Sequence, residues 1–204
     1  MTVFVLATHN AHKVDELRRI LGERLGPHQL IGYEGPEPVE DGDTFEANAL
    51  IKARAAAVFT GLPAIADDSG ICVDALDGAP GIHSARYAGT RDDGDNYRLL
   101  LKNMRGVVDR SAQFVCAAAL VDVAALDSGP IHGGAPSEHT ERGVWPGSVL
   151  EAPAGSGGFG YDPVFRPDGL DVSSAELTPA QKDADSHRGR AFGLLVTALR
   201  ERYG

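Results

Sequence analysis

Several features that mark specialised protein classes are scarce in this sequence of 204 residues. Its two cysteines, Cys72 and Cys116, lie in apolar segments and have no metal-ligand spacing between them. This pattern argues against a disulfide framework and indicates buried, reduced thiols in a cytoplasmic protein. The longest uncharged runs, 55–66 and 111–121, are far shorter than the ~18 apolar residues of a membrane span. The N-terminal stretch has no basic leader, so we expect neither a signal peptide nor a membrane segment.

Basic residues are also scarce. The chain has 29 Asp and Glu against 19 Lys and Arg, and its net charge of −10 argues against a general nucleic-acid-binding protein. A small anionic ligand is compatible with this charge, provided that basic side chains cluster locally and a cation assists. With 43% hydrophobic and 24% charged residues, the composition is that of a globular protein. No repeat or linker interrupts it, so we expect one domain that spans residues 1–204.

Familiar nucleotide and hydrolase motifs are missing: the sequence contains no Walker P-loop, no G-x-S-x-G and no H-E-x-x-H. The glycine-rich segment 152–162 does contain G-x-G-x-x-G. A dinucleotide-binding fingerprint needs a strand before it and a helix after it, and Pro163 blocks such a helix. The segment also carries Phe159 and Tyr161, which would either stack on a base or pack in the interior.

Hydrophobic patterning predicts an α/β fold. Apolar runs predict strands at 3–7, 28–33, 62–66, 71–76, 112–123 and 144–151. Helical periodicity with capping signals predicts helices at 11–25, 44–60, 91–104, 178–184 and 189–202. We expect Thr8 or Asn10 to cap the first helix, and Ser69 and Gly70 to turn the chain. The polar segment 124–142 is expected to form a solvent-facing loop or an irregular hairpin.

The stretch from Ala64 to Gly89 holds the acidic pair Asp67 and Asp68, which directly follows an apolar run. Acidic pairs at the end of a buried strand hold Mg²⁺ in many phosphate-processing sites, because this hard cation prefers carboxylate oxygens. Arg86, further along, is of a type that grips phosphate with two parallel hydrogen bonds. The same residues also suit a β-hairpin with a solvated turn, and this stretch alone does not decide between the two.

The few basic residues gather near the predicted turns. Lys13 lies in the first turn of a predicted helix, where a cation opposes the helix dipole unless an anion lies between them. Lys52 follows Asn48 by four residues, so both side chains project from one helix face. Another group near the C-terminus comprises Lys182, His187, Arg188 and Arg190. Together with the acidic pair, these clusters favour a site for a nucleoside phosphate and Mg²⁺.

Six segments of the chain match one family together. They are Thr8-x-Asn10-x-x-Lys13, Asn48-Ala49-x-x-Lys52-Ala53, Ala66-Asp67-Asp68-Ser69-Gly70, Gly81-Ile82-His83-Ser84-Ala85-Arg86-Tyr87, Gly158-Phe159-Gly160-Tyr161-Asp162-Pro163 and Ser186-His187-Arg188-Gly189. Through them the chain resembles the inosine triphosphate pyrophosphatase family, whose members act on noncanonical purine nucleoside triphosphates. The match runs from about Val3 to Leu199, and six segments in register are far more specific than any single one.

The resemblance implies an α/β fold with an elongated mixed β-sheet flanked by helices and two lobes around a central substrate cleft. It also implies a homodimer. The implied reaction is Mg²⁺-dependent hydrolysis of dITP, ITP and XTP to the nucleoside monophosphate and pyrophosphate, which cleanses the nucleotide pool. Two alternatives stay open: a nucleotide phosphohydrolase of other specificity, and a nucleotide-binding regulatory module without turnover.

By position, the resemblance implies roles for individual residues. Asp68 would be the general base for the attacking water and a metal ligand, and Asp67 and Glu40 would complete the metal site. Phe159 would stack on the base. The substrate-binding residues would be Thr8, His9, Asn10, Ala11, His12, Lys13, Asn48, Lys52, Ser69, Arg86, Phe159, Gly160, Tyr161, Asp162, Lys182, His187 and Arg188.

The chain departs from the family pattern at two places. Where the family usually has Thr-Phe-x-Glu-Asn-Ala, this chain has Thr44-Phe45-Glu46-Ala47-Asn48-Ala49, so the Glu is shifted by one position. One position is about 100° around a helix, so Glu46 cannot inherit the role of the family's Glu. The polar segment 122–142 is also longer than the family's usual connection, and we interpret it as a surface insertion.

Overall fold

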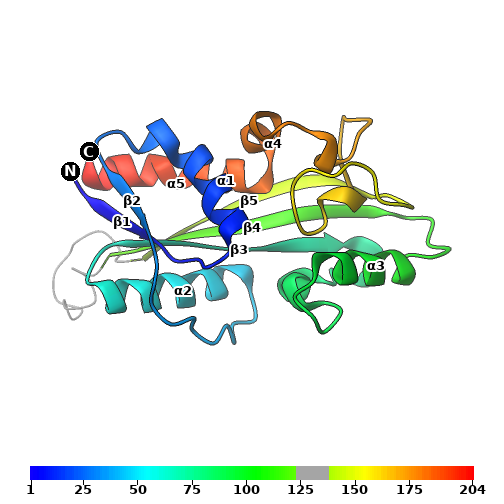
Figure 1. The fold of residues 1–204 in the computed structure, drawn as a ribbon, viewed down its shortest axis with the longest axis horizontal. Coiled ribbons are helices and arrows are strands. Elements are labelled where there is room, and N and C mark those ends of the chain that lie inside the picture. Colours follow the sequence, from blue (N-terminus) through cyan, green and yellow to red (C-terminus); the bar gives the residue numbers. More distant parts are fainter. Residues whose placement is uncertain (123–137) are drawn as a thin grey trace. The chain divides into compact units, whose positions relative to one another are not determined.

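The computed structural model describes residues 1–122 and 138–204. Their backbone forms an α/β architecture with a six-stranded sheet in the order β2-β1-β3-β4-β5-β6, as Figure 1 shows. The strands are β1 (Val3–Leu6), β2 (Gln29–Gly32), β3 (Ala64–Val73), β4 (Ser111–Val121), β5 (Glu138–Val149) and β6 (Phe165–Pro167). The sheet is mixed, because β1 pairs in parallel with β2 and β3 whereas β5 and β6 are antiparallel. The helices are α1 (Ala11–Leu21), α2 (Phe45–Thr60), α3 (Asp93–Asn103), α4 (Pro179–Asp185) and α5 (His187–Tyr203). The predicted mixed sheet with flanking helices is confirmed.

The chain divides into two compact units. The first comprises Met1–Asp68, Ala117–Arg142 and Arg190–Gly204, and the second comprises Ser69–Cys116 and Gly143–Gly189. Three strands, β3, β4 and β5, pass from one unit into the other. Among the described residues, no helix is both long and apolar enough to cross a membrane.

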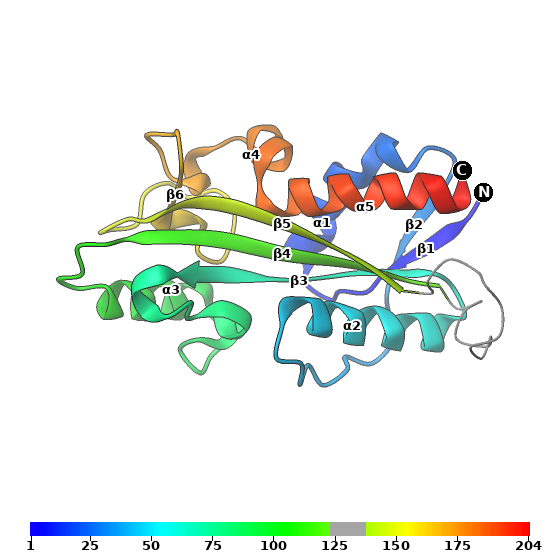
Figure 2. The same ribbon diagram turned by 180° about the vertical axis from the view of Figure 1, so that it is seen from behind.

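The first unit is layered. Figures 1 and 2 show α2 on one face of its strands and α1 and α5 on the opposite face. The α2 face toward the interior is built from small residues, Ala49, Ala53, Ala56 and Ala57, all fully buried. Because alanine side chains are short, this helix can lie close to the sheet and its longer polar side chains can reach the strands.

Local signals explain where the helices of the first unit begin and end. Asn10 caps α1, since its Oδ1 accepts hydrogen bonds from the backbone N–H groups of His12 and Lys13. Thr44 caps α2 in the same way, and Gly61 ends that helix in the left-handed conformation with φ of 67°. The first helix is shorter than the predicted 11–25, because Gly22 leaves the helical region and a 3₁₀ turn, Gly22–Leu25, follows.

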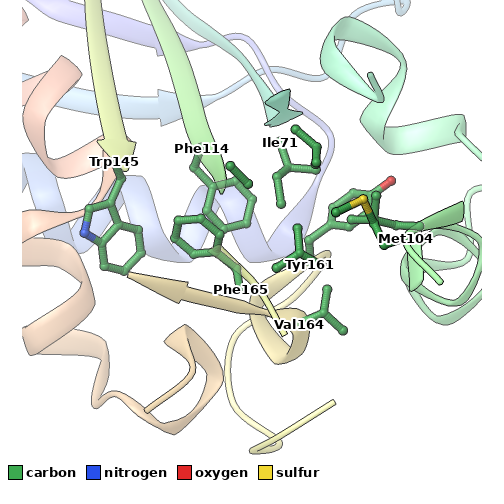
Figure 3. Close-up of a cluster of buried hydrophobic side chains, with 11 residues drawn as sticks. Ile71, Met104, Phe114, Trp145, Tyr161, Val164 and Phe165 are labelled. Carbon is green, nitrogen blue, oxygen red and sulfur yellow. The ribbon is translucent and has the colours of Figure 1, made fainter. Parts of the chain in front are cut away.

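The second unit has its own core, which Figure 3 shows in close-up. It contains Ile71, Val73, Leu100, Met104, Ala112, Phe114, Trp145, Val149, Tyr161, Val164 and Phe165. The rings of Phe114 and Phe165 pack edge to face with centroids 4.5 Å apart. These residues come from β3, β4, β5, β6, the end of α3 and the end of the glycine-rich segment, so the core anchors the chain on both sides of that segment.

The predicted turn at Ser69-Gly70 is wrong: β3 runs without a break from Ala64 to Val73. Gly70 serves close packing instead. A Cβ at this position would clash with the carbonyl oxygen of Gly81 and with Ser84 Oγ. Ser84 Oγ in turn accepts a hydrogen bond from the N–H of Ile71 at 3.0 Å. The glycine is needed because another backbone segment passes directly over the strand.

For segment 124–142, predicted as a loop or an irregular hairpin, the part that the structure describes is the start of a strand that neighbours β4, as in a hairpin. Residues 138–142 belong to β5, which begins at Glu138, whereas residues 123–137 lie outside the described part of the chain. Ion pairs hold this start of β5 to α2, since Arg54 forms two 2.6 Å contacts with Glu138 and Arg142 contacts Glu46 at 2.7 Å. Glu138 and Arg142 are thus partners of α2, and such polar residues made this stretch resemble a loop in sequence.

The packing at Gly70 leads to a prediction for stability. Gly70→Ala should lower the free energy of unfolding by about 1–3 kcal/mol, because the added methyl overpacks a tight backbone contact. Chemical denaturation would measure it. Gly32→Ala is the matched control, because Gly32 also lies in a strand but has open space around its Cβ position. The control should change by less than about 0.5 kcal/mol; equal effects of the two substitutions would contradict the packing role.

Candidate active site

A cluster of charged residues lies where β1 ends in the first unit. β1 pairs in parallel with β3 through Leu6 and Ile65, so the chain leaving β1 passes beside Asp67 and Asp68. We call Lys13, Glu40, Lys52, Asp67 and Asp68 the carboxylate–lysine cluster. Asp67 and Asp68 are 1% and 8% exposed, so both carboxylates have lost most of their water. Buried charges of this kind need partners, because desolvation is expensive.

Each carboxylate of the pair has its own lysine. Lys13 Nζ lies 2.9 Å from Asp67 Oδ2. Lys52 Nζ lies 3.2 Å from Asp68 Oδ1 and 2.9 Å from Glu40 Oε2. Three carboxylates against two ammonium groups leave the cluster one formal negative charge when all are ionised. It can therefore accept a further cation.

Strand geometry separates the two aspartates. Successive side chains of a β-strand point to opposite faces of the sheet. Asp67 meets Lys13 of α1, whereas Asp68 meets Lys52 of α2, and these helices lie on opposite faces (Figures 1 and 2). Asp68 and Glu40 therefore share one ammonium group, and Asp67 belongs to a separate ion pair.

The segment 8–13 forms the entrance to α1. The N–H of Asn10 donates to Thr8 Oγ1 at 3.2 Å, and Nδ1 of His9 lies 3.6 Å from a carboxylate oxygen of Glu37. Ala11 and His12 are exposed in the first turn of the helix. A helix N-terminus of this kind attracts anions through its free N–H groups and its dipole. The anion expected beside Lys13 is already supplied by Asp67, so a bound phosphate is not required to explain that lysine.

Burial and charge shift the pKa values of two members of the cluster. Burial raises the pKa of Asp68 above its ordinary 3.8, and the nearby Asp67 and Glu40 add to this, although Lys52 and Lys13 oppose it. Burial alone would lower the pKa of Lys52, but attraction to Asp68, Asp67 and Glu40 outweighs it and raises the pKa. A carboxylate with a raised pKa is a better proton acceptor, which suits a general base.

The donor set fits a divalent cation that shares its coordination with a substrate. Within residues 1–122 and 138–204, no three His, Cys, Asp or Glu side chains form a ready-made metal cage. Mg²⁺ does not need one, because it usually takes one or two carboxylates and completes its octahedron with water and phosphate oxygens. Glu40 and Asp68 already converge on one cation, the Lys52 ammonium group. Of the acidic residues in the cluster, these two could hold such a cation together.

A second group of predicted site residues lies in the second unit around the ring of Phe159. Lys182 Nζ is 4.9 Å and the guanidinium carbon of Arg188 is 5.1 Å from the ring centroid. Arg188 also donates a 2.7 Å hydrogen bond to Ser69 Oγ. Lys182 and Arg188 are buried, while Phe159 is partly exposed. The ring and the two cations could receive a flat, oxygen-bearing base.

Asp162 fixes the shape of this group. Its Oδ2 accepts hydrogen bonds from the N–H of Phe159 at 2.8 Å and from Lys182 Nζ at 2.5 Å. Its Oδ1 accepts a 2.6 Å hydrogen bond from Ser174, a residue that the sequence interpretation did not include. Gly158 is required beside it, because φ is 69° and a Cβ there would clash with the carboxylate. Asp162 therefore fixes the positions of both Phe159 and Lys182 through its carboxylate.

Three other predicted site residues are placed differently. Tyr161 is a core residue whose hydroxyl donates to the carbonyl of Ser84 at 2.8 Å, and burial raises its pKa. His187 is 2% exposed and stacks on Phe114 with ring centroids 4.7 Å apart. Arg86 is exposed at the end of a 3₁₀ turn, Gly81–Arg86. Of the two aromatic residues in the glycine-rich loop, Phe159 thus has the more exposed ring and Tyr161 packs in the interior.

Gly160 has a partner that the sequence did not suggest. Its N–H donates a 2.7 Å hydrogen bond to Asp93 at the start of α3. The loop is thereby fastened at two consecutive residues, Phe159 to Asp162 and Gly160 to Asp93. Both acceptors are carboxylates, which form stronger hydrogen bonds than neutral groups.

Solved structures match the whole fold. A HAM1 protein from Coxiella burnetii aligns with a TM-score of 0.85 at 39% identity, covering 98% of this chain and 100% of that chain. A Mycobacterium abscessus protein described as a nucleoside-triphosphatase and dITP/XTP pyrophosphatase aligns with a TM-score of 0.73 at 43% identity, covering 95% and 98%. The chain therefore has the architecture of the Ham1 proteins.

Sequence relatives agree. The dITP/XTP pyrophosphatase of Leifsonia xyli is 52% identical over 205 residues, covering 98% of this chain and 96% of that protein. The dITP/XTP pyrophosphatase of Streptomyces coelicolor is 49% identical over 211 residues and covers both chains completely. A model of the Ham1 family matches residues 4–198. The chain belongs to the Ham1 family, which confirms the family resemblance carried by the six sequence segments.

The raised pKa of Asp68 predicts a pH effect on stability. The folded chain keeps the Asp68 proton at pH values where the unfolded chain has released it, so this group's stabilising contribution is lost as pH rises above about 4. The free energy of unfolding of the wild type minus that of Asp68→Asn should therefore decrease as the pH rises above about 4. Urea denaturation in EDTA would measure it, since a bound cation would lower the same pKa. A difference that grows with pH would show that the folded pKa is lowered instead.

Proposed function

We propose that this protein hydrolyses noncanonical purine nucleoside triphosphates, namely dITP, ITP and XTP, to the nucleoside monophosphate and pyrophosphate. The observation that carries the proposal is the buried Asp68, whose carboxylate lies 3.2 Å from the Lys52 ammonium group. The cluster around it has one formal negative charge when all its groups are ionised, so it can bind a cation. Two relatives named dITP/XTP pyrophosphatases, which are 52% and 49% identical to this chain, support the substrate class. The reaction would remove from the nucleotide pool the triphosphates that mispair.

The proposed chemistry is an attack of water on the α-phosphate. Asp68 would accept a proton from the water as the water oxygen bonds to the α-phosphorus. The bond from the α-phosphorus to the bridging oxygen would break at the same time, so the products are the nucleoside monophosphate and pyrophosphate. Lys13, Lys52, Thr8 and Asn10 would hold the triphosphate at the entrance to α1, where N–H groups and the helix dipole attract anions. Hydrolysis of this kind depends mainly on positioning and on neutralising charge.

The proposed cofactor is a divalent cation, Mg²⁺. Glu40 and Asp68 would hold it, and it would supply neutralisation of the charge on the phosphate oxygens. Asp67 would contribute at longer range by balancing Lys13. This assignment keeps two of the three predicted metal ligands as direct contacts and gives the third a charge-balancing role.

The proposed base selectivity follows from an oxygen at C6. Hypoxanthine and xanthine carry an oxygen at C6, whereas adenine carries an amino group. Donors from Lys182 and Arg188, which lie around the Phe159 ring, would bond to the oxygen, whereas the adenine amine is itself a donor and could not accept from them. A hydrogen bond to a charged donor that adenine cannot form would cost about 1–3 kcal/mol, which is enough to discriminate between the bases. Phe159 would add stacking of about 1–3 kcal/mol that does not distinguish them.

The wider setting of the enzyme is also proposed from the family resemblance. We infer a homodimer that acts in the cytoplasm on free nucleotides. The net charge of −10 supports a small-molecule substrate over a polyanionic nucleic acid.

One assay tests the proposed function. The purified protein would be incubated with dITP, ITP, XTP, ATP and GTP, with Mg²⁺ or with EDTA, and pyrophosphate and orthophosphate would be measured separately. We expect pyrophosphate from dITP, ITP and XTP in Mg²⁺, and at least about tenfold slower turnover of ATP. Orthophosphate as the sole product would mean cleavage at another bond. Binding without turnover of any nucleotide would indicate a regulatory module.

The role of Asp68 predicts a kinetic effect. Asp68→Asn should lower kcat by roughly 10²–10⁴-fold, as expected when a general base is removed, while nucleotide binding is retained. Steady-state kinetics and calorimetric titration would measure the two quantities. Asp74→Asn is the matched control, because Asp74 is an exposed carboxylate in the same stretch of chain. Near-normal turnover of the Asp68 variant would remove Asp68 as the base.

A further inference from the structure

Asn48 is a buried polar residue of α2 whose side chain hydrogen-bonds to two other segments of the chain. It is 3% exposed. Its Oδ1 accepts a 2.9 Å hydrogen bond from the N–H of Gly42, and its Nδ2 donates a 3.3 Å hydrogen bond to Asp68 Oδ2. The orientation of the amide is unambiguous, because Gly42 presents a donor and must face the oxygen. The NH₂ group is therefore directed at the carboxylate.

The two oxygens of Asp68 are held by two different donors from one helix. Asn48 binds Oδ2 and Lys52 binds Oδ1. These residues are four positions apart on α2, so they share a helix face. Two donors on separate oxygens fix the carboxylate against rotation about its own axis. A carboxylate has about four acceptor positions, so roughly two remain for other partners.

The same two residues hold the segment that leads into α2. Asn48 binds the backbone of Gly42, and Lys52 binds the side chain of Glu40. A Cβ at Gly42 would lie only 2.7 Å from Asn48 Oδ1, so the backbone approaches the amide as closely as a glycine permits. Asn48 thus links the segment carrying Glu40 to the carboxylate of Asp68 through a single rigid side chain.

We propose that Asn48 is a positioning residue for Asp68, and that it acts on the carboxylate instead of binding the substrate as the family resemblance implied. This inference rests on the proposed function, in which Asp68 accepts a proton from water. By fixing the plane of the carboxylate, Asn48 directs its remaining lone pairs at the water and holds the Glu40 segment at a constant distance. A misplacement of about 1 Å in such an arrangement can cost about 10²-fold in rate.

The chain supplies a matched control in Asn96 of α3. It is 2% exposed, and its amide makes the same pattern of bonds: Oδ1 accepts from the N–H of Ala88 at 2.8 Å and Nδ2 donates to the carbonyl of Ala85 at 3.3 Å. The difference is the group that receives the Nδ2 hydrogen bond, a backbone carbonyl instead of Asp68. Equal substitutions at the two positions separate loss of a buried amide from loss of carboxylate positioning.

The experiment compares Asn48→Asp and Asn48→Ala with Asn96→Asp and Asn96→Ala. Asn48→Asp keeps the acceptor for Gly42 but replaces the donor with a second carboxylate facing Asp68. We expect both Asn48 variants to lower kcat by about 10²-fold with KM within about threefold of the wild type. The Asn96 variants should lose comparable stability by urea denaturation and keep kcat within about threefold. Asn48→Ser provides the same test if Asn48→Asp does not fold.

The outcomes distinguish this inference from the proposed function. A rise in KM at unchanged kcat in the Asn48 variants would show that Asn48 binds substrate, and would overturn the inference. Equal losses of kcat in the Asn48 and Asn96 variants would do the same, because they would indicate a structural effect. Absence of pyrophosphate release by the wild type would instead overturn the proposed function, before any variant is considered.

Discussion

The constraint on which the first unit depends is the burial of two adjacent carboxylates in the middle of a strand. Asp67 and Asp68 are almost fully removed from water, and an uncompensated buried charge is among the costliest features a fold can carry. The neighbouring elements are arranged to meet this cost. The first turn of α1 brings Lys13, the middle of α2 brings Lys52, and the capping residues Asn10 and Thr44 fix where those helices start.

The second unit also contains a buried carboxylate, that of Asp162, which is compensated by hydrogen bonds. Asp162 accepts hydrogen bonds from a backbone N–H, a lysine and a serine, so its negative charge organises the loop that carries Phe159. Carboxylates thus have two different uses in this protein. Asp68 has a raised pKa and lone pairs that can accept further hydrogen bonds. Asp162 instead accepts from its neighbours in the protein and so fixes the positions of Phe159 and Lys182.

Much of the fold could be predicted from the sequence because its signals are local. The caps at Asn10 and Thr44, the alanine-rich face of α2 and the apolar run of β4 are each visible in a few residues. The turn at Ser69-Gly70 was predicted wrongly, because the glycine there serves a contact with Gly81 and Ser84, which the sequence places more than ten residues away. Family segments brought most of the candidate site together. They could not separate residues around the Phe159 ring from residues that pack in the core, such as Tyr161. Nor could they reveal Ser174, whose role depends on a hydrogen bond to Asp162.

Because β3 runs without a break through Asp67 and Asp68, the register of this strand decides which way each aspartate points. Because neighbouring residues on a strand face opposite sides, the assignment of one aspartate to α1 and the other to α2 is a matter of strand register. A slip of one residue would exchange the two carboxylates between the helices and leave each lysine opposite the wrong neighbour. Had the pair lain on a flexible turn, such a slip could have been absorbed locally. Here the pairing of β3 with β1, a property of the sheet as a whole, determines which aspartate meets which helix.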